Sequence, residues 1–216
     1  MCMCGHERQK FVCYPISTAG RDGRAGINWI AERRFPADRP WRREDWNRPG
    51  DLGEFLPDFV PWRFPWLDVP ALIESAAAVY EYPMVDREPL PRWNFGRMTL
   101  LGDAAHPMYP IGSNGASQAI LDARALTAAV MRHGATPEAL TAYEAERRPK
   151  TSAIVLANRR NGPEQVMQMV EERAPDGFAD LDAVISRQEL EEIAATYKRL
   201  AGFDPAILNG EPDLFG

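Results

Sequence analysis

The residues best suited to chemistry lie in one stretch, LLGDAAHPMYPIGSNGAS, which covers residues 100–117. Asp103 follows Gly102 at the expected end of a strand, where open α/β sheets bind their ligands. A glycine at that point lets a ligand approach the backbone closely, because it has no Cβ atom. An ionised carboxylate accepts hydrogen bonds strongly, and Asp103 is therefore suited to the hydroxyl groups of a sugar or polyol.

A long Ala-rich segment follows, and we expect it to form one helix that ends just before Gly134. Its first backbone N–H groups have no acceptor within the helix, and the helix dipole favours negative charge near them. Either Ser113 or Asn114 is expected to cap this helix. The residues at its start are small or polar: Gly112, Ser113, Asn114, Gly115, Ala116 and Ser117. Together with Asp103 they suit a reduced flavin, which has a polyol chain and a ring edge that becomes anionic.

A longer run around these residues resembles a known family. The segment GRMTLLGDAAHPMYPIGSNGASQAILDARAL, residues 96–126, resembles the second flavin-binding motif of single-component FAD-dependent aromatic hydroxylases, the para-hydroxybenzoate hydroxylase family. The segments YPMVDREPLPRW and YEAERRPKTSAIVLANRRNGPEQVM, residues 82–93 and 143–167, resemble the branch that contains the phenazine hydroxylase of pyocyanin synthesis. The resemblance extends over nearly the whole chain.

The resemblance implies an FAD-dependent aromatic monooxygenase. In this family NAD(P)H reduces the flavin, O2 adds to it as a C4a-hydroperoxide, and one oxygen atom passes to a small electron-rich aromatic substrate. By position, Asp103 would bind the ribityl hydroxyls, Pro110 would lie beside the ring where oxygen reacts, and Gly112 to Ser117 would donate backbone N–H groups to the pyrimidine edge. No residue of the chain is assigned a catalytic role, since the cofactor carries the chemistry.

The chain also departs from the family pattern. Family members begin with a strand, a GxGxxG turn and a helix that bind the ADP half of FAD, and no GxGxxG occurs in these 216 residues. The chain resembles the C-terminal half of a complete member. We therefore expect a truncated gene, a mis-assigned start or a deliberate fragment, with weak or no FAD retention and no activity alone. A missing N-terminal half is an expected partner.

Two other functions compete with this interpretation. The chain could be a non-catalytic flavin- or nucleotide-binding remnant, or one half of a split protein that a partner completes. It could also be a generic anion-binding module at the helix start of Gly112 to Gly115. Such a module would bind phosphate whether or not Asp103 is present, whereas a flavin site needs that carboxylate.

Further residues are candidates for binding. Tyr109 and Met108, next to Pro110, are expected in an aromatic substrate wall; Tyr14 and Trp29 are candidates for the same wall, with a core role equally open. His106 has no Ser or Cys partner nearby and is expected to pack the loop. No metal site is expected: the cluster of Cys2, Cys4, His6 and Cys13 has a C-x-C spacing that structural zinc sites rarely use.

The helices and strands that position these residues are predicted from the spacing of apolar residues and from the glycines and prolines that interrupt it. Residues 9–17 and 27–35 predict an antiparallel pair of strands, and residues 68–80 predict a helix capped by Asp68. Residues 36–66 predict an irregular surface lobe anchored by tryptophans, or alternatively a lid or wall over an aromatic pocket. GRMTLLGD is expected to be a buried strand. Helices are expected from Thr136 to Pro149, over 150–160 and 163–173, and from a capping box at Ser186.

These elements predict an α+β fragment of an α/β flavoprotein, with an antiparallel substrate-domain sheet, one strand–loop–helix flavin-binding unit and a helical C-terminal tail. The expected regions are a partial substrate-binding domain over 1–91, the second half of an FAD-binding domain over 92–135, and a helical region over 136–216.

Composition narrows the function classes. A net charge of −6 and the lack of a Lys/Arg block argue against nucleic-acid and anionic-membrane partners. No apolar run approaches the ~18–20 residues of a membrane span. The three cysteines all lie near the N-terminus, an odd number that does not suggest a disulfide framework. A cytoplasmic enzyme is the simplest expectation.

Overall fold

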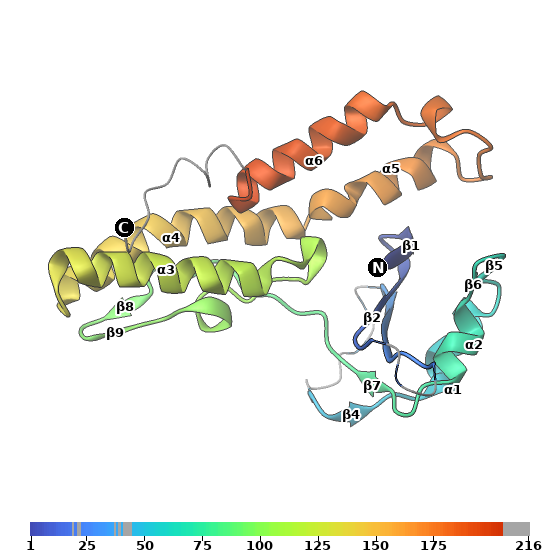
Figure 1. The fold of residues 1–216 in the computed structure, drawn as a ribbon, viewed down its shortest axis with the longest axis horizontal. Coiled ribbons are helices and arrows are strands. Elements are labelled where there is room, and N and C mark those ends of the chain that lie inside the picture. The colour runs from blue at the N-terminus through green and yellow to red at the C-terminus, as the bar shows by residue number, and fades with distance from the viewer. Residues whose placement is uncertain (19, 21–22, 37, 39, 41–44, 205–216) are drawn as a thin grey trace. The chain divides into compact units, whose positions relative to one another are not determined.

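The computed structural model describes residues 1–18, 20, 23–36, 38, 40 and 45–204, shown as the coloured ribbon in Figure 1. The chain divides into two compact units, Met1–Met84 and Val85–Gly216. The regions expected over 92–135 and 136–216 belong to one unit, because the long helices of the two regions pack along each other. The protein is a mixture of helices and small antiparallel sheets, in keeping with the expected α+β architecture.

The first unit is built on a three-stranded antiparallel sheet in the order β1–β2–β3. The expected pair is confirmed as β2 (Gln9–Pro15) and β3 (Ile27–Arg33). A third strand, β1 (Cys2–His6), was not expected; it pairs with β2 so that Cys2 lies opposite Cys13.

Two helices cover one face of this sheet. They are α1 (Leu52–Phe59), capped by Asp51, and α2 (Val69–Glu74), capped by Asp68 as expected. Their apolar residues Phe59, Val69 and Ile73 are fully buried against Phe11 of β2. Residues 68–80 thus form a shorter helix than the sequence predicted. The remaining strands of the unit are two-residue ladders: β4 (Arg48–Pro49) with β7 (Tyr80–Glu81), and β5 (Arg63–Phe64) with β6 (Leu67–Asp68).

The lobe expected over residues 36–66 is only partly irregular, since it contains α1. Pro57 lies inside that helix, near its end. Of the expected tryptophan anchors, Trp62 packs edge-on against Phe59, with ring centroids 5.2 Å apart. Trp46 and Trp66 are 60% and 66% exposed, so neither anchors the lobe. Trp41 lies outside the described residues.

The expected buried strand GRMTLLGD does not form. The segment contributes only β9 (Met98–Thr99), which makes a tight hairpin with β8 (Asn94–Phe95) around Gly96, and Met98 is 69% exposed. Within the described part of this unit, β8 is the one strand that pairs with it. A strand needs a neighbour for its backbone groups, and the chain instead turns at Gly102 into a short 3-10 helix, η1 (Gly102–Ala104).

The second unit is mainly helical, and its long helices lie side by side (Figure 1). The expected helix before Gly134 is confirmed as α3, and the helix that follows continues through Pro149, where the sequence predicted an end. Buried Arg147 and Thr151 on either side of that proline pack it into the unit. The helical elements are η2 (Ile111–Ser113), α3 (Gly115–His133), α4 (Pro137–Asn158), η3 (Gly162–Glu164), α5 (Gln165–Arg173), η4 (Leu181–Ala183) and α6 (Arg187–Ala201).

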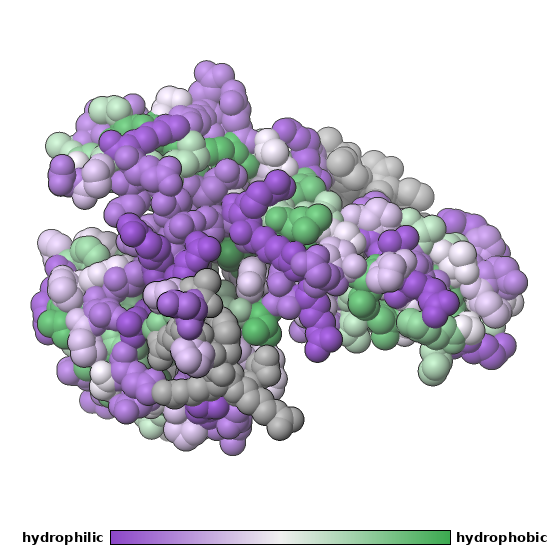
Figure 2. Space-filling model, turned by 180° about the vertical axis from the view of Figure 1, so that it is seen from behind, coloured by the Kyte–Doolittle hydropathy of each residue, from purple (hydrophilic) through white to green (hydrophobic). Residues whose placement is uncertain are grey.

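Alanines make the close packing of α3 and α4 possible. Ala125 and Ala129 of α3 meet Ala139 and Tyr143 of α4 in a core that also contains Trp93. The capping box at Ser186 is half formed: Ser186 Oγ accepts from Glu189 N at 3.2 Å, while the Glu189 carboxylate pairs with an arginine of α5. Hydrophilic residues and apolar patches alternate on the face shown in Figure 2. None of the helices in the described ranges is long and apolar enough to cross a membrane.

Candidate functional site

Gly102 makes the turn that presents Asp103. Its φ of 58° is left-handed, and a Cβ atom there would lie 3.3 Å from the Cβ atom of Ala119, so glycine suits the position on both counts. The turn is closed by the Gly102 carbonyl, which accepts from the backbone N–H groups of Ala105 and His106 at 2.8 and 2.9 Å. Asp103 is exposed, and its carboxylate makes no hydrogen bond or ion pair within the described chain.

A buried ionic cluster holds this turn from behind. Asp122 of α3 is fully buried; its carboxylate accepts from Gly102 N at 3.1 Å, bonds His106 Nε2 at 2.5 Å and pairs with Arg147 Nε at 2.7 Å. The Arg147 guanidinium also donates to Gln118 Oε1 at 2.7 Å. The cluster ties η1, α3 and α4 together, and it includes His106 in the loop-packing position that the sequence predicted.

The charge state of Asp122 follows from its partners. Burial acts to raise the pKa of Asp122, but the hydrogen bonds from His106, Arg147 and Gly102 outweigh it, and the pKa lies below its usual value. The carboxylate is therefore ionised at neutral pH. A buried carboxylate with three donors is a rigid support for the backbone that it binds.

The sequence interpretation missed this cluster. The available signal was the placement of Gln118 and Asp122 four residues apart on α3, in line with the buried alanines Ala125 and Ala129. Polar residues on the buried stripe of a helix must find partners, and a distant arginine such as Arg147 is a natural one. Spacing alone does not identify which arginine.

The start of α3 is open. The first backbone N–H of the helix with an acceptor is that of Gln118, which donates to Asn114 O at 2.9 Å. Within the described chain the N–H groups of Gly115, Ala116 and Ser117 therefore have no acceptor. Ala116 is exposed, and a Cβ atom on Gly115 would meet nothing closer than Met108 Cγ at 4.0 Å.

The expected capping of α3 is wrong for both candidates. Ser113 is exposed with a left-handed φ of 50°, and neither its side chain nor that of Asn114 bonds the helix start. The Asn114 amide instead donates Nδ2–H to Tyr197 Oη of α6 at 2.6 Å. The loop before the helix is thus held by tertiary contacts, while its own N-terminal N–H groups are left available.

Two more contacts hold the loop at its middle. Asn158 Nδ2 donates to the Tyr109 carbonyl at 3.1 Å, and Gly112 N donates to Glu164 Oε1 at 3.4 Å. Pro110 between them is exposed, which leaves one face of its ring free for a ligand. Asp103, Pro110 and the helix start therefore belong to one braced loop.

Two of the candidate substrate residues, Tyr14 and Trp29, point to opposite faces of the first unit's sheet. Tyr14 lies directly opposite Asn28, which donates Nδ2–H to Tyr14 Oη at 2.9 Å, so the two share a face of the sheet. Trp29 follows Asn28 and points to the other face, where it stacks on Phe11 with ring centroids 6.1 Å apart. Met108 and Tyr109 belong to the second unit.

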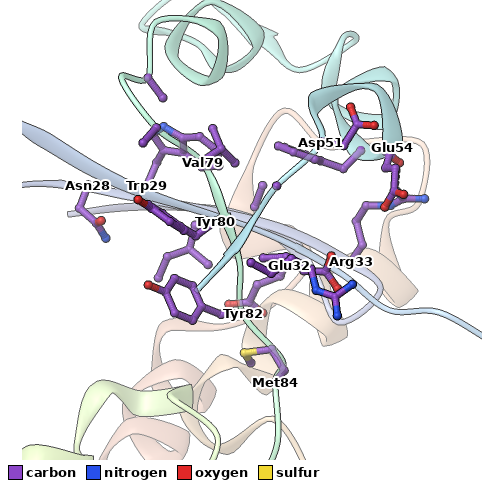
Figure 3. Close-up of a pocket in the computed structure, with 18 of the residues that line it drawn as sticks. Asn28, Trp29, Glu32, Arg33, Asp51, Glu54, Val79, Tyr80, Tyr82 and Met84 are labelled. Carbon is purple, nitrogen blue, oxygen red and sulfur yellow. Dashed lines mark hydrogen bonds between the residues drawn. The ribbon is translucent and has the colours of Figure 1, made fainter. Parts of the chain in front are cut away.

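A cleft of about 1100 Å³ opens in the first unit. It lies along β3 and is lined by Trp29 together with aromatic residues that the sequence did not single out, Tyr80 and Tyr82. Figure 3 shows Asn28 and Trp29 towards one end and Asp51 and Glu54 towards the other. An aromatic and partly acidic lining of this size suits a small organic ligand.

The three cysteines are free thiols on β1 and β2. Cys2 Sγ and Cys4 Sγ lie 3.5 Å apart, and burial together with the neighbouring Cys2 raises the pKa of Cys4 to about 12. The Cys4 thiol is therefore protonated at neutral pH, which makes it a poor nucleophile and metal ligand. The described residues contain no group of three His, Cys, Asp or Glu side chains placed to bind a metal ion.

Comparison with known proteins identifies the family. Residues 80–158 match the family described as FAD binding domain. Phenazine 1,6-dicarboxylic acid hydroxylase PhzS of Lysobacter antibioticus is 52% identical over 151 residues, which are 69% of this chain and 37% of that protein. A 6-hydroxynicotinate 3-monooxygenase of Bordetella bronchiseptica is 31% identical over 156 residues, 71% of this chain and 38% of that protein.

The fold comparison agrees. A solved salicylate hydroxylase in complex with substrate matches 98% of this chain and 50% of its own, with a TM-score of 0.56 and 24% identity, which shows a shared fold. The chain spans 37% and 38% of the two curated relatives. By these matches, the chain belongs to the family of FAD-dependent aromatic hydroxylases.

Proposed function

We propose that this chain forms the flavin-ring and substrate part of a cytoplasmic FAD-dependent monooxygenase that hydroxylates a small aromatic compound. The observation that carries the proposal is the pairing of two unsatisfied groups on one braced loop. The Asp103 carboxylate is exposed and without a partner in the described chain, and the first N–H groups of α3 have no acceptor there. A flavin offers hydroxyl donors for the first group and an acceptor edge for the second.

The residues present fit this cofactor. Asp103 would accept hydrogen bonds from ribityl hydroxyls, and the N–H groups of Gly115, Ala116 and Ser117 would donate to the N1–C2=O edge of the ring. Charge at a helix start is worth about 1–2 kcal/mol when partly buried, and its sign favours the reduced, anionic ring. Pro110 would form an apolar wall beside the ring that excludes water.

Bound FAD would supply the redox chemistry, taking electrons from NAD(P)H and activating O2 for transfer of one oxygen atom to the aromatic ring. The protein's part is positioning. Met108 and Tyr109, which directly precede Pro110, are proposed to contact the substrate. Tyr14 and Trp29 lie on opposite faces of the first unit's sheet, so at most one of the two is proposed to contact the substrate.

The ADP half of FAD has no evident site in these residues, since no GxGxxG turn occurs in the sequence. We therefore propose that the chain alone holds FAD weakly and that a complementary N-terminal half completes the enzyme. The same observation keeps a second candidate open, a flavin- or nucleotide-binding remnant without catalysis.

Titration of the chain with FAD, riboflavin and inorganic phosphate tests the flavin site. Asp103→Ala should lower the affinity for FAD and for riboflavin about tenfold or more, since it removes a charged acceptor for their hydroxyls. Asp176→Ala, which removes another exposed carboxylate elsewhere in the second unit, is the matched control. Phosphate binding that ignores Asp103, with no flavin binding at all, would support the generic anion-binding module instead.

Catalysis is tested by complementation. The chain is mixed with the N-terminal half of a relative, and NAD(P)H-dependent O2 uptake is measured with aromatic acids. Substrate-stimulated uptake supports the enzyme. Flavin binding to the mixture without any uptake would favour the remnant.

A further inference from the structure

The side chain of Asn114 is turned away from the helix that it precedes. Asparagine is among the best N-cap residues, because its side-chain oxygen accepts from the second or third N–H of the helix. In α3 those groups belong to Ala116 and Ser117, and Asn114 makes no such bond. Its Nδ2–H instead donates to Tyr197 Oη of α6 at 2.6 Å.

A chain of hydrogen bonds determines the orientation of this amide. The Tyr109 carbonyl can only accept, so the Asn158 amide must present Nδ2–H to it, at 3.1 Å. Asn158 Oδ1 then accepts the single hydroxyl proton of Tyr197 at 2.8 Å. The Ile111 carbonyl, 3.4 Å from Tyr197 Oη, can only accept as well. Tyr197 Oη therefore has only lone pairs to offer Asn114, and Asn114 must act as the donor.

This orientation leaves the Asn114 oxygen without a partner. Asn114 is 2% exposed, and its Oδ1 is buried with no hydrogen bond in the described chain. A buried amide oxygen without a donor is rare, and three N–H groups without acceptors lie at the start of the adjoining helix. The bond to Tyr197 therefore holds an unpaired acceptor away from these donors. Capping of the helix would also need the Asn114 backbone to move from its ψ of 3° into the extended region of an N-cap.

The contact with Tyr197 is built into the loop. Gly112 has a left-handed φ of 74°, and a Cβ atom there would collide with the Tyr197 phenol. Gly162, also left-handed, lies against the other side of the ring, where a Cβ atom would come within 3.0 Å of Tyr197 Cε2. Burial raises the pKa of Tyr197, so its hydroxyl keeps the proton that Asn158 accepts.

We propose that Tyr197 is a positioning residue of the flavin site, which keeps α3 uncapped by holding the Asn114 side chain away from it. The N–H groups of Ala116 and Ser117 then stay open for an anionic ring edge. The inference rests on the proposed function for the identity of the ligand, but the capping competition itself is a property of the free chain. A C-terminal helix thereby controls a site more than eighty residues earlier in the sequence.

Amide hydrogen exchange of the free chain tests the competition without any flavin. Tyr197→Phe removes the hydroxyl and releases Asn114, whose oxygen can then cap α3. Exchange at Ala116 and Ser117 should slow, although the variant has lost the three hydrogen bonds of the Tyr197 hydroxyl. A merely structural role for Tyr197 predicts the opposite, faster exchange throughout the loop, and that result or unchanged exchange would overturn the proposal.

Flavin affinity gives the second readout. Tyr197→Phe should weaken the affinity for riboflavin and for FAD about fivefold, because the ligand would then have to displace one N-cap hydrogen bond. In the double variant with Asn114→Ala no side chain remains to cap the helix, and affinity should return to within about twofold of wild type. Tyr143→Phe, which removes a buried tyrosine hydroxyl in the core of the same unit, should leave affinity unchanged.

The outcomes separate the two proposals. If Tyr197→Phe slows exchange at Ala116 and Ser117 but the wild-type chain binds no flavin, the positioning role stands and the proposed function fails. If flavin binds and the double variant stays as weak as Tyr197→Phe, the flavin site stands and the positioning role fails. Circular dichroism shows whether Tyr197→Phe unfolds. If it does, the Asn114→Ala variant tests the positioning role, because it must bind flavin with the affinity of wild type.

Discussion

The Asp122 carboxylate lies 2.7 Å from Arg147 Nε, and both side chains are buried between α3 and α4. The second carboxylate oxygen accepts from Gly102 N at 3.1 Å. The Asp122 carboxylate thus links α3 to α4 through an ion pair and also holds the turn that carries Asp103. The relationship explains how a loop made of small residues can hold a defined shape.

Removing one partner of this pair should destabilise the fold strongly. Asp122→Ala leaves the Arg147 charge buried without a counter-ion, and we expect a loss of about 3–5 kcal/mol in the free energy of unfolding. Urea denaturation measures it. Arg187→Ala, which breaks an exposed pair with Glu191, is the control and should cost no more than about 0.5 kcal/mol. Equal effects of the two variants would contradict this role of the cluster.

The same cluster should make stability depend on pH in the acid range. The pKa of Asp122 is lowered in the folded state, so its contribution is present above the unfolded value, about 3.9, and is lost as pH falls from there through the folded value. Unfolding free energies measured between pH 7 and pH 2 should therefore fall less steeply in Asp122→Asn than in wild type. Parallel curves would show that the carboxylate is not preferentially ionised in the folded chain.

Substitution of the glycine beneath Tyr197 should cost more than backbone strain alone. Gly112 and Gly177 both have left-handed φ angles, 74° and 90°, but a Cβ atom on Gly177 meets open space. Gly177→Ala should cost about 1 kcal/mol, the strain of an L-residue in that region. Gly112→Ala should cost about 1–3 kcal/mol more, because the methyl group displaces the Tyr197 ring. Thermal and urea unfolding of the two variants give the comparison.

The thiol of Cys4 should react slowly in the folded chain. Its pKa is raised to about 12, whereas an ordinary cysteine titrates near 8.5. Alkylation by iodoacetamide at pH 8, located by mass spectrometry, should be at least about tenfold slower at Cys4 before unfolding in urea than after it, and should accelerate with rising pH. Equal rates in the two states would argue against the buried, protonated thiol.

Several features followed from the sequence because they depend on local physics. The sequence predicted the strands β2 and β3, the caps at Asp68 and Ser186, and the end of α3 at Gly134. These features depend on turn residues, caps and positive-φ glycines, which act over a few residues. The loop proposed to bind the flavin was singled out by its run of Gly, Asp and Pro residues. The assignment of its individual residues to FAD stays a prediction.

Other features required the tertiary structure. GRMTLLGD has the composition of a buried strand, yet it forms two strand residues and a turn, because strand formation depends on a neighbour that local sequence does not reveal. α4 passes through Pro149 because the buried residues around it outweigh one missing hydrogen bond. Asp122 and Arg147 are 25 residues apart in sequence, and nothing in their spacing indicates that they meet.

The sequence by itself indicated the family and the cofactor class, and it predicted which residues would bind the flavin, because these depend on residue type and order along one short loop. Only the tertiary structure decided how that loop is supported and whether its helix start is capped. Asn114 is a natural cap by local rules, but a phenol from α6 takes its side chain. Whether such a side chain bonds its own helix or a distant residue depends on how the helices pack, and the order of residues alone does not show that packing.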